Sequence, residues 1–157
     1  LGVDTETRPS FSKGRGFQVS LLQVSTRDTC YLFRLHLTGI TPAIIRFLED
    51  KTVPKVGLSW HDDLLQLHKR AEFKPGYFIE LQDEAKKFGL QDMSLQKLYA
   101  NLFHQKISKA QRLSNWEASE LKDSQMAYAA TDAWCCINLY EELLRLKQEG
   151  DYELDEL

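Results

Sequence analysis

Cysteine is scarce in this 157-residue chain, and its placement does not indicate disulfides. Cys30 and the adjacent Cys135 and Cys136 form neither an even framework nor a C-x-x-C pair. We therefore expect an intracellular, reducing compartment: cytoplasmic in a bacterium, nuclear in a eukaryote. No uninterrupted apolar run approaches the roughly 18 residues of a bilayer span. The chain opens LGVDTE without a basic region before an apolar stretch, so we expect no secretory signal.

A positive charge excess is also absent, since the net charge is −3. This argues against a protein that holds polyanions by bulk charge alone. The charge is uneven, because residues 149–157 hold five acids and no base, which leaves +2 for the rest. Two stretches of the chain contain bases but no acids. Each is interpreted either as a basic strip or as an ordinary solvated surface. Their bases are Arg8, Lys13, Arg15 and Arg27 in the first, and Lys97, Lys106, Lys109 and Arg112 in the second.

What the chain does contain predicts one globular domain. Hydrophobic residues make up 43% and charged residues 27%, which excludes disorder. Strand patterns are followed by a helix, another strand and a helical second half, so we expect an α/β fold with a mixed central sheet flanked by helices. Predicted strands are 1–6, 17–25, 31–37 and 55–60; predicted helices are 41–48, 62–71, 81–88, 95–103 and 123–148. We assign 1–150 to the domain and 151–157 to an acidic tail.

Two acidic patterns stand where predicted strands end. Asp4 and Glu6 are two apart on the first strand, so both side chains project from one face. Alone, a D-x-E pair is a weak signal, because a polar strand face has the same pattern. Asp62 and Asp63 follow the strand KVGLSW at a helix start, where acids are favoured by the helix dipole. Capping accounts for one of these aspartates and hardly for both.

A third pattern lies in the long helix. Tyr128 and Asp132 are one turn apart, so a phenol and a carboxylate share a direction. A half-buried tyrosine with a solvated aspartate is the alternative interpretation. Small residues surround the pair in the stretch YAATDA and allow close packing of this helix on the sheet.

Taken together, the ordered patterns resemble the DEDD superfamily of 3'-5' exonucleases, tyrosine subtype, on a ribonuclease H-like fold. The chain is most similar to the exonuclease domain of Werner-syndrome helicase and its bacterial relatives, and more distantly to ribonuclease D. The matching stretches run along nearly the whole chain: VDTE at 3–6, LLQV at 21–24, VGLSWHDDLLQL at 56–67, SLQKLYANL at 94–102, SNW at 114–116 and YAATDA at 128–133.

The resemblance implies a metal-dependent exonuclease that removes nucleotides from a 3' end. In that family four acids would hold two divalent ions, Mg²⁺ or Mn²⁺, for which carboxylate oxygens are suitable ligands. Here these positions are Asp4, Glu6, Asp132 and one of the 62/63 pair. We favour Asp63 because leucines follow it at 64 and 67, and Asp62 stays open. Tyr128 would orient the attacking water. The histidine subtype would carry its histidine at position 127, which is alanine.

The resemblance also implies contacts with nucleic acid, DNA rather than RNA by preference. Trp116 either stacks on a base or packs in the core. The expected contact residues are Thr5, Thr7, Arg8, Lys106, Lys109, Arg112 and Trp116. No nucleotide cofactor is expected, because Lys13-Gly14-Arg15-Gly16 lacks the third glycine of a dinucleotide loop and no Walker sequence is present.

Two expectations concern the whole protein. The first strand begins only three residues before Asp4, which is compatible with a preceding segment or further domain outside this sequence. The rival to an enzyme is a catalytically inactive nucleic-acid-binding or protein-interaction module on the same fold. Such modules usually lose an acidic ligand, whereas all four acidic positions and the tyrosine are filled here.

Overall fold

The computed structural model describes residues 1–14, 16–91 and 93–150. The acidic tail 151–157 and Arg15 of the first acid-free stretch therefore lie outside the described residues. Within them, no helix is long and apolar enough to cross a membrane.

The predicted mixed sheet is confirmed. Five strands run in the order β3-β2-β1-β4-β5, with β1 (Gly2–Thr7) at the centre. It pairs antiparallel with β2 (Val19–Ser25), which in turn pairs antiparallel with β3 (Cys30–Arg34). On its other side β1 pairs parallel with β4 (Lys55–Gly57), which pairs parallel with β5 (Phe78–Glu80). The strand β5 was not predicted.

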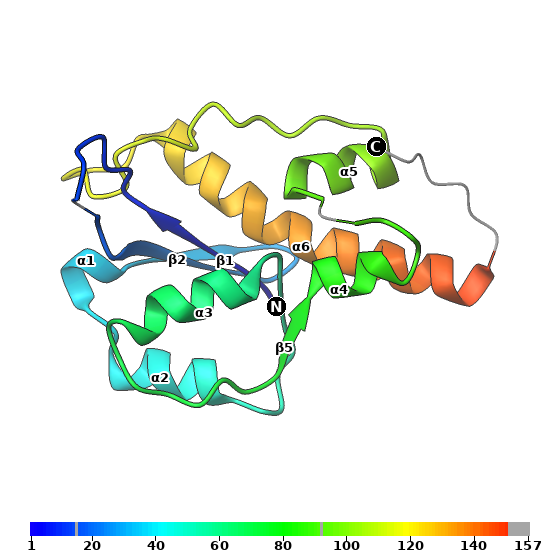
Figure 1. The fold of residues 1–157 in the computed structure, drawn as a ribbon, viewed down its shortest axis with the longest axis horizontal. Helices are drawn as coiled ribbons and strands as arrows, with labels where there is room; N and C mark the ends of the chain where they lie inside the picture. Colours follow the sequence, from blue (N-terminus) through cyan, green and yellow to red (C-terminus); the bar gives the residue numbers. More distant parts are fainter. Residues whose placement is uncertain (15, 92, 151–157) are drawn as a thin grey trace.

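Helices cover both faces of the sheet (Figure 1). One face carries α1 (Leu35–Thr38), α2 (Pro42–Glu49) and α3 (Trp60–His68), whose core includes Val3 and Leu22. The other carries α6 (Asp123–Glu149), with α4 (Leu81–Lys86) and α5 (Leu95–Phe103) against it. Leu21 packs with α6 and Leu22 with the opposite layer, as alternation along a strand requires.

Two predicted strands were too long. Residues 31–37 were expected as one strand, but pairing ends at Arg34 and the helix α1 begins at Leu35, which is fully buried. Residues 55–60 were also expected as a strand. There β4 ends at Gly57, and Ser59 turns the chain into α3 with a positive φ of 61°.

The central strand approaches α6 very closely. A Cβ added to Gly2 would lie 2.0 Å from the carbonyl oxygen of Ala133, so glycine is required there. Ala129 and Ala133 are fully buried on the facing side of α6. This close approach brings side chains of α6 next to those at the C-terminal end of β1.

Candidate active site

Asp4 and Glu6 lie on the α6 side of β1, in line with the prediction that they share a face. Val3, between Gly2 and Asp4, packs in the opposite layer. The backbone N–H of Thr5 donates a hydrogen bond to Asp4 Oδ1 at 2.8 Å, which fixes that carboxylate. Both acids are partly buried at the point where the strand leaves the core.

The helix α6 adds Asp132 to this pair. Carboxylate oxygens of Asp4, Glu6 and Asp132 all lie within 4.8 Å of one another. Asp132 is 4% exposed, and its Oδ1 has no hydrogen-bond partner within the described part of the chain. The alternative interpretation, in which Asp132 is solvated, is therefore wrong. Asp132 is buried and faces two other acids.

The adjacent residues Asp62 and Asp63 differ in their exposure and in what they face. Asp63 is half-buried and Asp62 exposed. Asp63 interacts electrostatically with Asp4 and accepts a hydrogen bond from the Thr5 side chain, although it is outside the 4.8 Å group. Asp63 thus faces β1 from the α3 side. That it ligates a metal stays a prediction, as it does for the other three acids.

The pKa values of the four acids are all raised. Burial raises the pKa of Asp4 to about 7 and that of Asp132 to about 8. It raises the pKa of Asp63 to about 8, with the charge of Asp4 acting in the same direction. Burial and the charges of Asp4, Asp132 and Asp63 together raise the pKa of Glu6 to about 9. Without a counter-charge, the site retains protons at neutral pH.

Tyr128 lies one turn before Asp132 and hydrogen-bonds to it, which opposes the rise in the aspartate pKa. Burial raises the pKa of Tyr128, and the charges of Asp132, Glu6 and Asp4 raise it further. The phenol therefore stays protonated at physiological pH. It can donate a hydrogen bond or hold a water but cannot serve as a base.

The residues present fit divalent cations. Mg²⁺ and Mn²⁺ prefer carboxylate oxygens, and the cluster supplies these from two elements. The raised pKa values and the unpaired Asp132 Oδ1 are the features expected of acids that lack a cation partner. When bound, such cations would supply stabilisation of the charge that grows on phosphoryl oxygens.

The acids open into a cavity of about 450 Å³. Among the described residues that line this cavity, Arg112 is the one cation, and Cys136 is buried. The positive charge of Arg112 opposes the rise in the pKa of Tyr128, which lines the same cavity. The other lining residues are Asp4, Thr5, Glu6, Leu58, Ser59, Gln82, Ser94, Leu95, Gln96, Tyr128 and Asp132.

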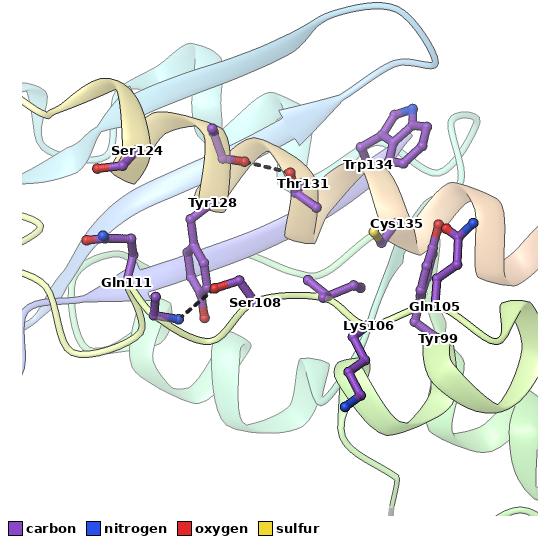
Figure 2. A pocket seen from close by; sticks show the side chains of 13 residues that line it. Tyr99, Gln105, Lys106, Ser108, Gln111, Ser124, Tyr128, Thr131, Trp134 and Cys135 are labelled. Carbon is purple, nitrogen blue, oxygen red and sulfur yellow. Dashed lines mark hydrogen bonds between the residues drawn. The ribbon is translucent and has the colours of Figure 1, made fainter.

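A second hollow, of about 440 Å³, lies between α6 and the segment 105–111. Figure 2 shows Tyr128 pointing from α6 toward that segment, with Lys106 beyond Ser108. The Thr131 hydroxyl has its hydrogen-bond partner within α6, since it donates to the Ala127 carbonyl at 2.7 Å. Tyr128 lines both hollows, so the two meet at the phenol.

The prediction that Trp116 stacks on a base is wrong. Its side chain is fully buried and packs with Leu21, Tyr128 and Ala129. A ring without exposed surface cannot meet a base arriving from solvent. The core-packing alternative is the correct one, and the indole supports the face of α6 that carries Tyr128.

The other predicted nucleic-acid contacts are spread around the cavity. Thr5 and Arg112 line it, and Lys106 lines the adjoining hollow. Thr7 and Lys109 are exposed without lining either. Arg8 lies over the ring of Phe17, with its guanidinium carbon 4.6 Å from the ring centroid. The contacts themselves stay predictions.

Sequence reasoning missed Gln23. It is fully buried in β2 opposite Asp4, and its side chain hydrogen-bonds to Glu6, which opposes the rise in the pKa of that acid. Its Nε2 also donates to the Ala129 carbonyl at 3.3 Å. A glutamine within the apolar stretch VSLLQVS was the available signal, because a buried amide needs polar partners.

The fold and the carboxylate cluster define a nuclease of the metal-dependent class, and comparison with known proteins agrees. A family model described as 3'-5' exonuclease matches residues 1–147. This chain belongs to that family and carries a hydrolytic 3'-5' exonuclease domain.

The curated relatives include proteins of several kinds. A Mus musculus protein named bifunctional 3'-5' exonuclease/ATP-dependent helicase WRN is 30% identical over 149 residues, 91% of this chain and 11% of that protein. An Arabidopsis thaliana protein named 3'-5' exonuclease is 33% identical over 150 residues, 91% of this chain and 52% of that protein. This chain thus spans about half or less of the length of these relatives.

Solved structures confirm the ribonuclease H-like fold. The Nibbler EXO domain of Aedes aegypti superposes with a TM-score of 0.79 at 20% identity, covering 96% of this chain and 80% of that one. Escherichia coli RNase D superposes with a TM-score of 0.78 at 20% identity, covering 94% of this chain and 39% of that one.

Proposed function

We propose that this protein is a metal-dependent 3'-5' exonuclease that hydrolyses the terminal phosphodiester of DNA, and of RNA less well, with two divalent ions. Nucleoside 5'-monophosphates are the product. The observation that carries the proposal is the convergence of Asp4, Glu6 and Asp132 within 4.8 Å. Asp63 faces them from α3 and completes the predicted ligand set.

In the proposed reaction, a water oxygen bonds to the terminal phosphorus. The bond to the 3' oxygen of the preceding nucleotide breaks, and that oxygen takes a proton. Tyr128 holds the water through its protonated hydroxyl, which its raised pKa keeps neutral. Arg112 neutralises phosphate charge at the mouth of the cavity. The four acids hold Mg²⁺ or Mn²⁺.

The preference for DNA rests on the similarity to the mouse helicase and exonuclease and to a DNA polymerase I of Aquifex aeolicus. The similarity to relatives named ribonuclease D is an argument for RNA instead. The described residues include no feature that must recognise a 2'-hydroxyl. Sugar preference is therefore a direct outcome of the experiment.

The test uses matched 5'-labelled DNA and RNA strands with Mg²⁺, with Mn²⁺ and with a chelator. We expect a ladder that shortens from the 3' end only when metal is present and forms faster on DNA. Faster shortening of RNA reverses the sugar preference and leaves the reaction class intact. Intact strands under every condition, with the protein folded and able to bind DNA, would instead support the inactive binding module.

A further inference from the structure

The helix that carries Asp63 begins in an unusual way. Its first flanking residue, Ser59, has φ 61° and ψ 40°, and its side chain makes no capping hydrogen bond. The left-handed region costs a non-glycine residue about 1 kcal/mol or more. The free backbone N–H groups of a helix start also need acceptors. Another group must therefore hold this turn.

The carboxylate of Glu80 supplies the missing cap from a different element. Glu80 Oε1 accepts from the N–H of Ser59 at 2.8 Å, and Oε2 accepts from the N–H of Trp60 at 2.5 Å. Oε1 also accepts from the N–H of Gln82 at 3.1 Å, which caps α4. One carboxylate therefore closes the starts of two helices.

The strands β4 and β5 place Glu80 there. Glu80 is the last residue of β5 and pairs with Gly57, the last residue of the parallel strand β4. The ring of Trp60 packs edge-on against Phe78, with centroids 4.8 Å apart. A Cβ on Gly57 would lie 2.5 Å from Trp60 Nε1, so the indole fills the space above the strand. The first turn of α3 is thus seated on both strands.

We propose that Glu80 is a positioning residue that holds the start of α3 and thereby presents Asp63 to Asp4 and the metal site. Ser59 and Gln82, which Glu80 holds, both line the catalytic cavity. Glu80 is not part of the carboxylate group formed by Asp4, Glu6 and Asp132, and its Oε1 accepts two backbone N–H groups and its Oε2 one. This inference rests on the proposed function, since it assigns Asp63 to the metal site.

The test is Glu80→Gln, which keeps the shape but turns one acceptor into a donor. In metal-free protein, we expect the amides of Ser59 and Trp60 to exchange hydrogen faster, while that of Leu139 in α6 keeps its rate. Direct titration should show the dissociation constant of Mn²⁺ rising about tenfold, as for residues that orient ligands. The KM for DNA should change less than about twofold, because phosphate contacts are untouched.

The matched control is Asp83→Asn, which removes an exposed charge from α4 and should change none of these quantities. Weaker Mn²⁺ binding with unchanged exchange at Ser59 and Trp60 would overturn the proposal, because Glu80 would then act as a ligand. Unchanged Mn²⁺ binding would overturn it as well. If Glu80→Gln does not fold, Glu80→Asp, which is one methylene shorter, carries the same test.

Exchange and Mn²⁺ binding are both measured without nucleic acid. A wild-type protein that binds Mn²⁺ but releases no nucleotide would contradict the proposed function, while the role of Glu80 would still be decided by these two measurements.

Discussion

The indole of Trp116 lies against the phenol ring of Tyr128, with ring centroids 6.0 Å apart and an angle of 29° between the planes. Trp116 is fully buried and Tyr128 is 9% exposed. The contact therefore fixes the ring of the predicted catalytic tyrosine from behind, while its hydroxyl reaches Asp132. The position of that hydroxyl follows from core packing.

Replacing Tyr128 with phenylalanine tests the role of the hydroxyl. We expect kcat to fall about 10²-fold or more, the range for a group that assists proton transfer or orients water. The Mn²⁺ affinity should stay within about threefold, because the four acids are unchanged. Kinetics with saturating DNA and a direct Mn²⁺ titration measure the two quantities.

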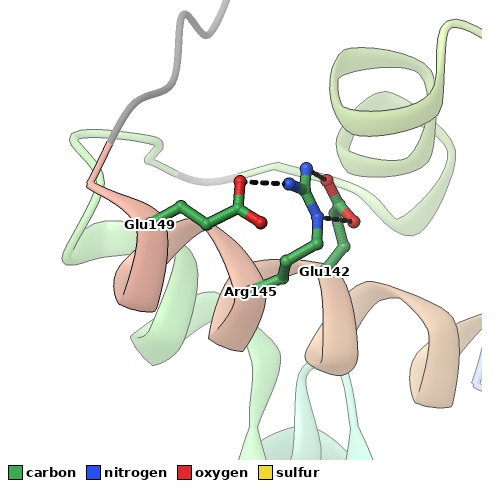
Figure 3. A network of polar contacts seen from close by, with 3 residues as sticks. All are labelled: Glu142, Arg145 and Glu149. Atoms are coloured by element: carbon green, nitrogen blue, oxygen red, sulfur yellow. Dashed lines mark hydrogen bonds and ion pairs between the residues drawn. The ribbon is translucent and has the colours of Figure 1, made fainter.

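A control for that variant lies at the far end of the same helix. Arg145 forms ion pairs with Glu142 and Glu149 on the exposed surface of α6 (Figure 3). Such pairs contribute roughly 0–1 kcal/mol, so Arg145→Ala should leave kcat unchanged. Full activity in Tyr128→Phe, or a loss of Mn²⁺ affinity as large as the loss of kcat, would refute the assignment.

Trp116→Phe tests whether the indole serves packing or nucleic acid. A smaller ring leaves a cavity beside Leu21 and Tyr128, so we expect the free energy of unfolding to fall by about 1–3 kcal/mol. The KM for DNA should change less than about twofold, since phosphate contacts remain. Urea unfolding and steady-state kinetics measure these values. Unchanged stability with a strongly raised KM would restore the base-stacking interpretation.

Mutation of Asp62 and Asp63 in turn tests which of the two is the metal ligand. Asp63→Asn should lower kcat at least about 10²-fold and weaken Mn²⁺ binding, because a neutral amide is a poorer ligand for a hard cation. Asp62→Asn removes a charge from the same turn at an exposed position and should stay within about twofold of wild type. The same assay on both variants decides the question, and the reverse order of effects would make Asp62 the ligand.

The metal-free protein should lose stability as pH rises. The pKa values of the four acids in the folded state are about 7, 9, 8 and 8, above the usual values near 4 of the unfolded chain. Between about pH 4 and 9 the folded state thus binds more protons, so the free energy of unfolding falls as pH rises through this range.

Thermal unfolding in a chelator measures this effect. We expect Tm to decrease from pH 5 to pH 9, and Asp132→Asn to flatten the decrease because one titrating acid is gone. Mn²⁺ should raise Tm more at pH 8 than at pH 5, since ligands must be deprotonated to bind. A Tm that rises with pH in the chelator would show that the acids are not buried together.

Much of this site was predictable because its patterns are local. The spacing of Asp4 and Glu6 sets one strand face, and that of Tyr128 and Asp132 sets one helix face. The start of the predicted helix 41–48 is also confirmed, since the Thr41 hydroxyl accepts from the N–H of Ile44 at 3.2 Å and caps α2. The predicted long helix 123–148 differs from α6 by a single residue at its end.

The features that were missed depend on contacts distant in sequence. The strand β5 has only three residues, too few for an alternating pattern, and its pairing with β4 defines it. For Trp116 the sequence left base stacking and core packing open, and its complete burial in the folded chain decides for core packing. The role of Gln23 depends on the register of β2 against β1, which a single sequence does not specify.

Release of the terminal nucleotide is the most direct measure of hydrolysis at the carboxylate cluster. DNA carrying ³²P at its last phosphodiester is incubated in single turnover with Mn²⁺ and wild-type protein, Asp132→Asn, or the exposed control Asp123→Asn from the same helix. We predict labelled nucleoside 5'-monophosphate from wild type and Asp123→Asn, and none from Asp132→Asn. Equal release by Asp132→Asn, or label appearing only in 3'-terminal oligonucleotides and not in mononucleotide, would contradict this prediction.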